Sequence, residues 1–305
     1  MTTEQLLKNL QVPKRTVDVV LDTDAYNEID DQFAIAYLLK SADKLTTKAL
    51  YAAPFHNGKS YGPEDGMLKS YDEIFKLLDL AEIKDFENHV YKGSTCYLSD
   101  ENTPVISPAA EDLAKRALSY SADNPLYVVA IGAITNVASA LLINPQIKEN
   151  IVVVWLGGHA HHYPNTKEFN MFQDVAAARV VMNSGVPFVQ LPCMGVVSTF
   201  TVSGPELTYW LKGKNALADY LAENTIAEAA SYAKNKIWSR VIWDVTAVAW
   251  LLNDNNRFMN CRLEHTPIPE YDHRYGLNPN GQLMCYTYNI NRDNLMNDLF
   301  EKLTK

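Results

Sequence analysis

The feature that most constrains the fold is a repeated alternation between short β-branched runs and longer helical patterns. The strand-like runs are residues 17–21, 46–53, 125–132, 150–158 and 186–193, and helical patterns at 31–41, 66–80, 134–145 and 173–185 lie between them. Such alternation is typical of βαβ units in a parallel sheet, and the continuously apolar runs suit strands buried on both faces. The sequence predicts an α/β fold, a mostly parallel central sheet with helices on both faces and a Rossmann-like core.

Helix boundaries and the second half of the chain fit one domain. Ser107 before Pro108 predicts a capped helix start, and Gly185 predicts the end of a helix. After Gly204 the pattern is mainly helical, followed by a turn-rich segment, a strand at 283–290 and a closing helix at 292–303. No linker, repeat or low-complexity tract divides the chain, so we expect a single domain over residues 1–305.

Composition narrows the classes of partner. The chain has 305 residues, a formal net charge of −9 and no basic block, which disfavours nucleic acids and anionic membranes and favours a small neutral or cationic ligand. The first residues lack the pattern of a signal peptide and the apolar runs are too short to span a bilayer, so we expect a cytoplasmic protein.

The cysteines give no functional signal. Cys96, Cys193, Cys261 and Cys285 are scattered, without a CxxC motif or a histidine spacing typical of zinc sites. We expect reduced, mostly buried thiols and assign them no role.

Acidic residues gather where the first strand gives way to a helix. The stretch from Leu21 to Leu39 contains Asp22, Asp24, Glu28, Asp30 and Asp31. These residues fall at the carboxyl edge of the predicted sheet, where open α/β folds bind ligands. Two acids at a helix start could simply complement the helix dipole, at about 0.3–1 kcal/mol each, but that leaves the strand-end acids unexplained.

Crowded carboxylates repel one another unless a cation lies among them. Calcium takes six to eight oxygen ligands, so the remaining donors must come from other segments. Two candidates are the backbone carbonyls of residues 128–132, at the same sheet edge, and Asp244, which opens an otherwise apolar helix. An acid at that position needs either a capping role or a partner.

Two other classes of enzyme also carry a DxD motif. Haloacid-dehalogenase-type phosphatases carry Thr or Val two positions after the motif, where this chain has Tyr26. A glycosyltransferase DxD would hold a metal and a nucleotide sugar, but it leaves Asp30 and Asp31 without a role.

Several motifs in the same order resemble the nucleoside hydrolase family. That family has a strand, DxD, a short turn and DD opening a helix, followed by an LTN helix, a VVLMGG strand, an EFN segment and a late Asp helix. The matching segments here are residues 22–31, VVAIGAITNVASALLINP at 128–145, VVVWLGG at 152–158, KEFNMFQDVAAARVV at 167–181 and WDVTAVAW at 243–250. The likeness covers most of residues 17 to 255, and the closing helix also fits.

The resemblance implies a set of roles. Asp24, Asp31 and Asp244 would bind calcium through their side chains and Ile131 through its carbonyl, and Asp24 would also be the general base. The resemblance further implies substrate contacts from Asp30, Asn57, Leu156, Glu168, Asn170, Trp243 and Asp244, with Asp22 and Asn27 supporting the site. His56 is an equally good match to the family position assigned to Asn57. Without the resemblance, Glu168 and Asn170 would be interpreted as residues of a solvated loop. Family members commonly form homodimers or homotetramers, which we expect here.

Two departures from the family bear on substrate choice. At the position of Trp243, broad-specificity and inosine-uridine preferring members have a His that protonates the leaving base. The purine-preferring branch also has Trp there, and this Trp stacks on the base. The alternative is that Trp243 is a core residue. The turn at Ala25–Ile29 is two residues longer than usual, which brings Asn27 and Glu28 toward the site.

A histidine-rich stretch also differs from the family pattern. His159, His161 and His162 lie near the expected pocket mouth as acids, base contacts or surface residues.

The sequence favours a calcium-dependent hydrolase of the N-glycosidic bond of purine ribonucleosides or a related N-riboside. A catalytically silent calcium and pentoside binder is the second hypothesis, and a metal-dependent glycosyltransferase is the third.

Overall fold

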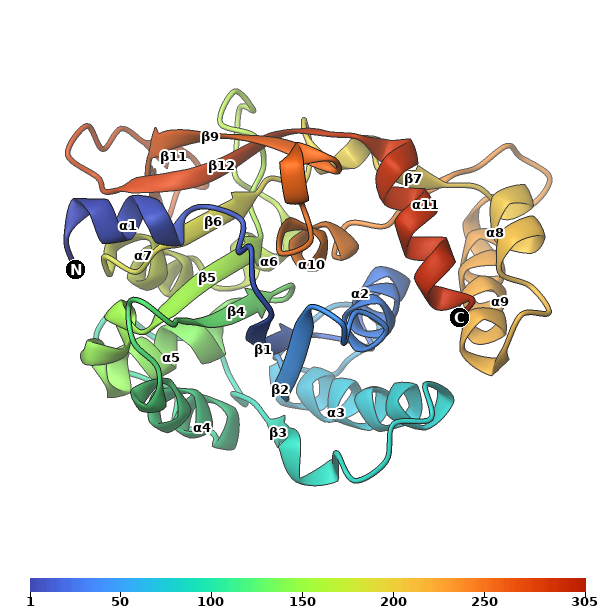
Figure 1. The fold of residues 1–305 in the computed structure, drawn as a ribbon, viewed down its shortest axis with the longest axis horizontal. Coiled ribbons are helices and arrows are strands. Elements are labelled where there is room, and N and C mark those ends of the chain that lie inside the picture. The colour runs from blue at the N-terminus through green and yellow to red at the C-terminus, as the bar shows by residue number, and fades with distance from the viewer.

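An eight-stranded sheet runs through the centre of the molecule. The computed structural model describes residues 1–305, and the sheet order is β3-β2-β1-β4-β5-β6-β12-β9 (Figure 1). All neighbours pair in parallel except β9, which runs antiparallel to β12. The strands are β1 (Val17–Thr23), β2 (Leu45–Ala52), β3 (Val90–Lys92), β4 (Leu126–Ala130), β5 (Ile151–Leu156), β6 (Phe188–Leu191), β9 (Met259–His265) and β12 (Leu283–Ile290).

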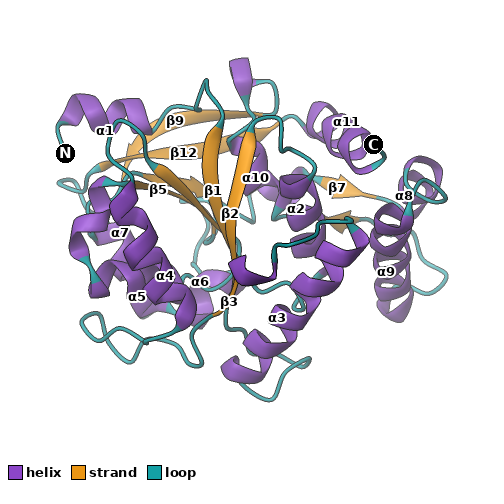
Figure 2. Ribbon diagram, turned by 60° about the horizontal axis from the view of Figure 1, so that its bottom comes forward, coloured by secondary structure: helices purple, strands orange, loops and turns teal.

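Helices cover both faces of this sheet, as the alternating pattern predicts (Figure 2). The helices are α1 (Thr3–Asn9), α2 (Ile29–Leu39), α3 (Pro63–Leu80), α4 (Pro108–Arg116), α5 (Thr135–Ile143), α6 (Phe169–Gln173), α7 (Val175–Asn183), α8 (Gly204–Trp210), α9 (Ala216–Tyr232), α10 (Val245–Trp250) and α11 (Arg292–Leu303). Two-residue strands pair outside the main sheet, β7 (Thr201–Val202) with β8 (Arg240–Val241) and β10 (Ile268–Pro269) with β11 (Tyr275–Gly276). The α/β fold class is confirmed.

Side-chain alternation along the strands builds two separate cores. Val19 and Leu21 of β1 face a core shared with α2, α3, α10 and α11, whereas Val20 faces a core shared with α4, α5 and α7. Every residue of β4 and β5 is buried, because these central strands have helices on both sides. The expected caps are present, since the Ser107 hydroxyl accepts from the Ala110 N–H and Gly185 follows α7 with a φ of 86°.

Two local expectations differ from the structure. The segment expected to be rich in turns contains β9, an edge strand that was not predicted because its polar, partly exposed residues give no apolar run. The helix expected over residues 173–185 is interrupted at Asp174, which ends α6 and whose carboxylate accepts from the Ala177 N–H at the start of α7.

Strand order determines where a ligand can bind. The chain moves outward from β1 to β2 and β3 on one side, then returns to place β4 on the other side of β1. The carboxyl ends of β1 and β4 therefore border a topological switch point, the usual ligand crevice of such sheets. None of the helices combines the length and hydropathy needed to cross a bilayer.

Candidate active site

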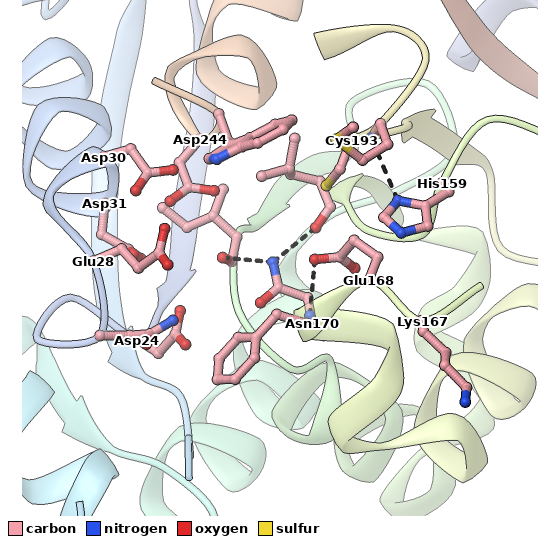
Figure 3. A pocket seen from close by; sticks show the side chains of 16 residues that line it. Asp24, Glu28, Asp30, Asp31, His159, Lys167, Glu168, Asn170, Cys193 and Asp244 are labelled. Atoms are coloured by element: carbon pink, nitrogen blue, oxygen red, sulfur yellow. Dashed lines mark hydrogen bonds between the residues drawn. The ribbon is translucent and has the colours of Figure 1, made fainter. Parts of the chain in front are cut away.

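A pocket of about 230 Å³ opens at this switch point and collects most of the residues expected from the sequence (Figure 3). The expected residues that line it are Asp24, Asn27, Asp30, Asp31, Ile131, Leu156, Glu168, Asn170, Trp243 and Asp244. Asp22 and Asn57 are outside the lining. The remaining lining residues are Glu28, His159, Lys167, Phe169, Cys193 and Met194.

The aspartates converge from three segments. Asp24 follows β1, Asp30 and Asp31 lie in the first turn of α2, and Asp244 lies at the start of α10. One carboxylate oxygen each from Asp30, Asp31 and Asp244 lie within 4.8 Å of one another. Asp24 lies beside Gly132, where an added Cβ would be 2.9 Å from Asp24 Oδ1 and would force the carboxylate to shift.

Hydrogen bonding leaves part of this cluster without donors. Both oxygens of Asp24 and Oδ1 of Asp30 are buried and have no hydrogen-bond partner. Asp31 accepts a 2.6 Å bond from the Thr23 hydroxyl, and Asp244 makes no side-chain capping bond to α10. Helix capping therefore does not explain Asp244, and burying charged oxygens without partners is costly.

Burial also changes the protonation of the cluster. Desolvation raises the pKa of Asp31 to about 7, and burial together with the neighbouring Asp31 charge raises the pKa of Asp24 well above its usual value. The pKa values of Asp30 and Asp244 are raised by burial and then by neighbouring acids. A cation placed among these carboxyl groups would favour their ionised forms.

Asp22 lies behind the lining and is held by a residue that the sequence analysis missed. Its Oδ1 accepts a 2.7 Å bond from Asn136 Nδ2, while Asn136 Oδ1 accepts from the N–H and hydroxyl of Ser94. Burial raises the pKa of Asp22 to about 7. Asn136 falls in the segment that resembles the family's LTN helix, but the sequence assigned it no role.

Backbone carbonyls and one amide form the pocket floor. Asn170 Nδ2 donates to the carbonyls of Ile131 and Leu156, both at 3.0 Å. This single side chain therefore ties the ends of β4 and β5 to α6. A carbonyl oxygen has two lone pairs, so that of Ile131 retains one for another partner.

Glu168 is as buried as the aspartates but fully bonded. Its carboxylate accepts from the backbone N–H groups of Gly158 at 2.8 Å, Asn170 at 2.9 Å and Met171 at 3.0 Å. These bonds offset the desolvation that raises its pKa. Glu168 is therefore part of the pocket wall and not a solvated loop residue.

The long turn after β1 places two polar residues at the pocket. The Asn27 side chain lines it, while Asn57 Nδ2 donates to Asn27 Oδ1 at 2.6 Å and the Lys59 ammonium donates to the Asn27 carbonyl. Asn57 therefore reaches the site through Asn27, and a direct substrate contact stays a prediction. Glu28 also lines the pocket and pairs with Arg240 of β8 at 2.6 Å.

The histidines have different surroundings. His159 lines the pocket, where burial lowers its pKa and its Nδ1 accepts a long 3.4 Å bond from the Met194 N–H. His161 lies instead between Glu264, at 2.8 Å, and Gln190. His162 is exposed. Sequence spacing could not separate these three, because a loop has no side-chain period.

The donor set fits a hard cation. Unpartnered buried carboxylates beside carbonyl oxygens are the ligands that calcium prefers, and no sulfur or imidazole lies in the oxygen cluster of Asp30, Asp31 and Asp244. The four cysteines are free, and Cys193 unexpectedly reaches the pocket.

Fold and site together define an α/β protein with an acidic ligand pocket at the switch point of its sheet. The family model of the inosine-uridine preferring nucleoside hydrolases matches residues 19–278. The chain belongs to this family, which confirms the resemblance and displaces the phosphatase and glycosyltransferase interpretations.

Named relatives carry different base preferences. A non-specific ribonucleoside hydrolase, RihC, of Salmonella schwarzengrund is 31% identical over 161 residues, which are 51% of this chain and 50% of that protein. A pyrimidine-specific ribonucleoside hydrolase, RihA, of Klebsiella pneumoniae is 26% identical over 66% of this chain and 68% of its own. The match to a pyrimidine-specific RihB of Escherichia coli O157:H7 covers 33% of that protein, so the chain spans half the length or less of several curated relatives.

Solved structures support the fold over nearly the whole chain. A plant nucleoside hydrolase, PpNRh1, superposes with a TM-score of 0.74 at 18% identity, covering 94% of this chain and 99% of that one. A purine-preferring ribonucleoside hydrolase from Gardnerella vaginalis gives a TM-score of 0.74 at 20% identity, covering 94% and 98%. At these identities the likeness establishes the fold alone.

Proposed function

We propose that this protein hydrolyses the N-glycosidic bond of ribonucleosides, with a preference for purines, and that calcium is its cofactor. The observation that carries the proposal is the set of buried, unpartnered carboxylate oxygens of Asp24 and Asp30 at the switch point. Family membership supports the same reaction class. The cleft offers both a cation site and acceptors for sugar hydroxyls.

Four groups would hold the cation: the carboxylates of Asp24, Asp31 and Asp244 and the carbonyl of Ile131. The tight grouping of Asp31 and Asp244 with Asp30 supports this assignment. Bound calcium would lower the pKa of a water molecule and hold it near the sugar. Asp22, fixed by Asn136, would keep the strand end in position.

The protein side chains then divide the remaining work. Asp24 takes a proton from the attacking water, since both of its oxygens are free of other donors. Asp30, Glu168 and Asn170 bind the ribose hydroxyls. As the bond to the base breaks, positive charge develops on the sugar, and the surrounding carboxylates stabilise that charge.

Trp243 is proposed to stack on the departing base. Trp243 precedes Asp244 in the sequence, is partly buried against the core and also lines the pocket. Its ring is therefore held by packing while part of it stays accessible to a ligand. A large purine ring covers more of an indole face than a pyrimidine does. The purine-preferring structural neighbour is consistent with this choice, whereas the curated relatives favour pyrimidines or neither base.

The test is ribose release from a panel of purine and pyrimidine nucleosides, with added calcium and again after chelation. We expect release that depends on calcium and favours purines. Calcium binding without ribose release from any N-riboside would replace this proposal with the silent pentoside binder.

Assembly and location stay predictions. We propose a homodimer or homotetramer in the cytoplasm. Size-exclusion chromatography with light scattering would test the assembly, and a monomeric mass would contradict it.

A further inference from the structure

The pocket lining carries much more negative than positive charge. Its carboxyl groups are those of Asp24, Glu28, Asp30, Asp31, Glu168 and Asp244, whereas Lys167 is its one lysine and it has no arginine. A divalent cation would offset two of these charges. A bound cation would also favour the ionised forms of the neighbouring acids, so the lining would keep an excess of negative charge and favour a ligand that brings positive charge.

Glu28 adds to this charge from the longer turn. Its Oε2 lies 2.6 Å from Arg240 Nη2, and the pair fixes the carboxylate at the pocket wall. The negative charge of Glu28 acts on Asp30 and Asp31. Arg240 does not line the pocket, so it balances Glu28 from behind the wall.

No histidine lies beside the aspartates to protonate a leaving base. Trp243 occupies the place before Asp244, and an indole N–H is not an acid. His159 and Lys167 lie across the pocket from Asp30, Asp31 and Asp244 (Figure 3). A neutral nucleoside loses its base as an anion unless a proton arrives, so a substrate whose base leaves without a proton has an advantage in this pocket.

Resting on the proposed hydrolase function, we infer that the substrate class is N-ribosides whose heteroaromatic base carries a fixed positive charge, such as pyridinium or N7-alkylated purine ribosides. Water forms a bond to the anomeric carbon while the carbon–nitrogen bond breaks. Its electron pair returns to the ring nitrogen and neutralises the base, and the water proton passes to Asp24. Ribose and a neutral base leave, so no proton donor is required.

Movement of charge during this reaction suits the pocket. Positive charge passes from the base to the sugar, toward the carboxylates of Asp24, Asp30 and Asp244. These carboxylates therefore stabilise the transition state more than they stabilise the bound substrate. Before cleavage, the Trp243 ring offers a cation–π surface to the base.

The experiment compares 7-methylguanosine, a cation in mildly acidic buffer, with neutral guanosine. The kcat/KM of each is divided by its uncatalysed hydrolysis rate, which removes the better leaving ability of the cation. We expect the wild-type protein to favour the cation by about tenfold. A ratio of one or less would overturn the inference.

Paired variants test the charge itself. Glu28→Gln should lower the preference about fivefold, whereas Arg240→Gln, which frees Glu28 from its partner, should raise it by a similar factor. Glu206→Gln, in the remote Glu206–Arg292 pair, is the matched control and should leave the ratio unchanged. If the Glu28–Arg240 pair has a purely structural role, both variants should lower kcat/KM for both substrates by the same factor. That result would overturn the inference.

Failure of this inference is separable from failure of the proposed function. Calcium-dependent cleavage of inosine or guanosine without preference for 7-methylguanosine would retain the hydrolase and overturn the substrate class. No cleavage of any of these compounds would overturn both.

Discussion

Two walls of the pocket both contain buried carboxylates, but the carboxylates differ in their hydrogen bonding. On one wall, Asp24 and Asp30 are 1% and 2% exposed and retain oxygens without partners. On the other, Glu168 is 7% exposed and accepts three backbone N–H bonds. A buried carboxylate with three donors stabilises the fold, whereas one without donors stores free energy that a ligand can release.

This contrast separates carboxylates that the fold leaves without donors from Glu168, which the fold holds through three backbone bonds and which is also proposed to contact the ribose. Removing charge from the aspartate wall should reduce function and spare stability. Removing the charge of Glu168 should mainly reduce the free energy of unfolding.

Asp24→Asn should reduce kcat/KM for ribose release by about 10³-fold, since it removes the side chain proposed as both general base and cation ligand. In chelator, the free energy of unfolding should rise by about 1 kcal/mol, because the cost of burying a carboxyl group whose pKa is raised and whose oxygens lack partners is gone. Urea unfolding and ribose release measure the two effects. Exposed Asp43→Asn is the control, and loss of stability equal to the loss of function would contradict the contrast.

Calcium should stabilise the wild-type protein by about 2.7 kcal/mol when its concentration is a hundred times the dissociation constant. The physical reason is that the cation binds the folded aspartate cluster and has little affinity for the unfolded chain. Thermal unfolding with calcium and with chelator gives the shift. Asp31→Asn should abolish most of it, and identical melting temperatures in the wild-type protein would rule out the cation site.

Glu168→Gln should lower the free energy of unfolding by about 2 kcal/mol. The amide NH₂ would face one of the backbone N–H groups that now donate to a carboxylate oxygen. Chemical denaturation measures the loss, with exposed Glu149→Gln as the control. An unchanged midpoint would show that the two walls do not differ.

Sequence analysis identified the aspartate wall because its geometry follows from element boundaries. Asp24 follows a strand, Asp31 and Asp244 begin helices, and the ends of parallel strands meet at one edge of a sheet. The same reasoning gave the sheet and its covering helices. It missed β9, since an edge strand with exposed polar residues lacks a hydrophobic run.

The opposite wall was less predictable. His159, Lys167 and Met194 reach the pocket from loops, where no period relates neighbouring side chains. The hydrogen bond from Asn136 to Asp22 joins residues 114 positions apart, so no local sequence pattern predicts it. Asn27 was anticipated as a consequence of the longer turn, but its bond to Asn57 was not.

The smallest expected effect concerns Trp243, which borders the aspartate wall without carrying charge. Trp243→Leu should reduce kcat for guanosine about fivefold, corresponding to about 1 kcal/mol of lost stacking, and should change kcat for uridine less. Calcium-induced stabilisation should remain, because Asp244 keeps its place at the start of α10. Steady-state kinetics with both nucleosides tests this split. Equal losses for purine and pyrimidine would assign Trp243 to packing, since only a face in contact with the base can distinguish a large ring from a small one.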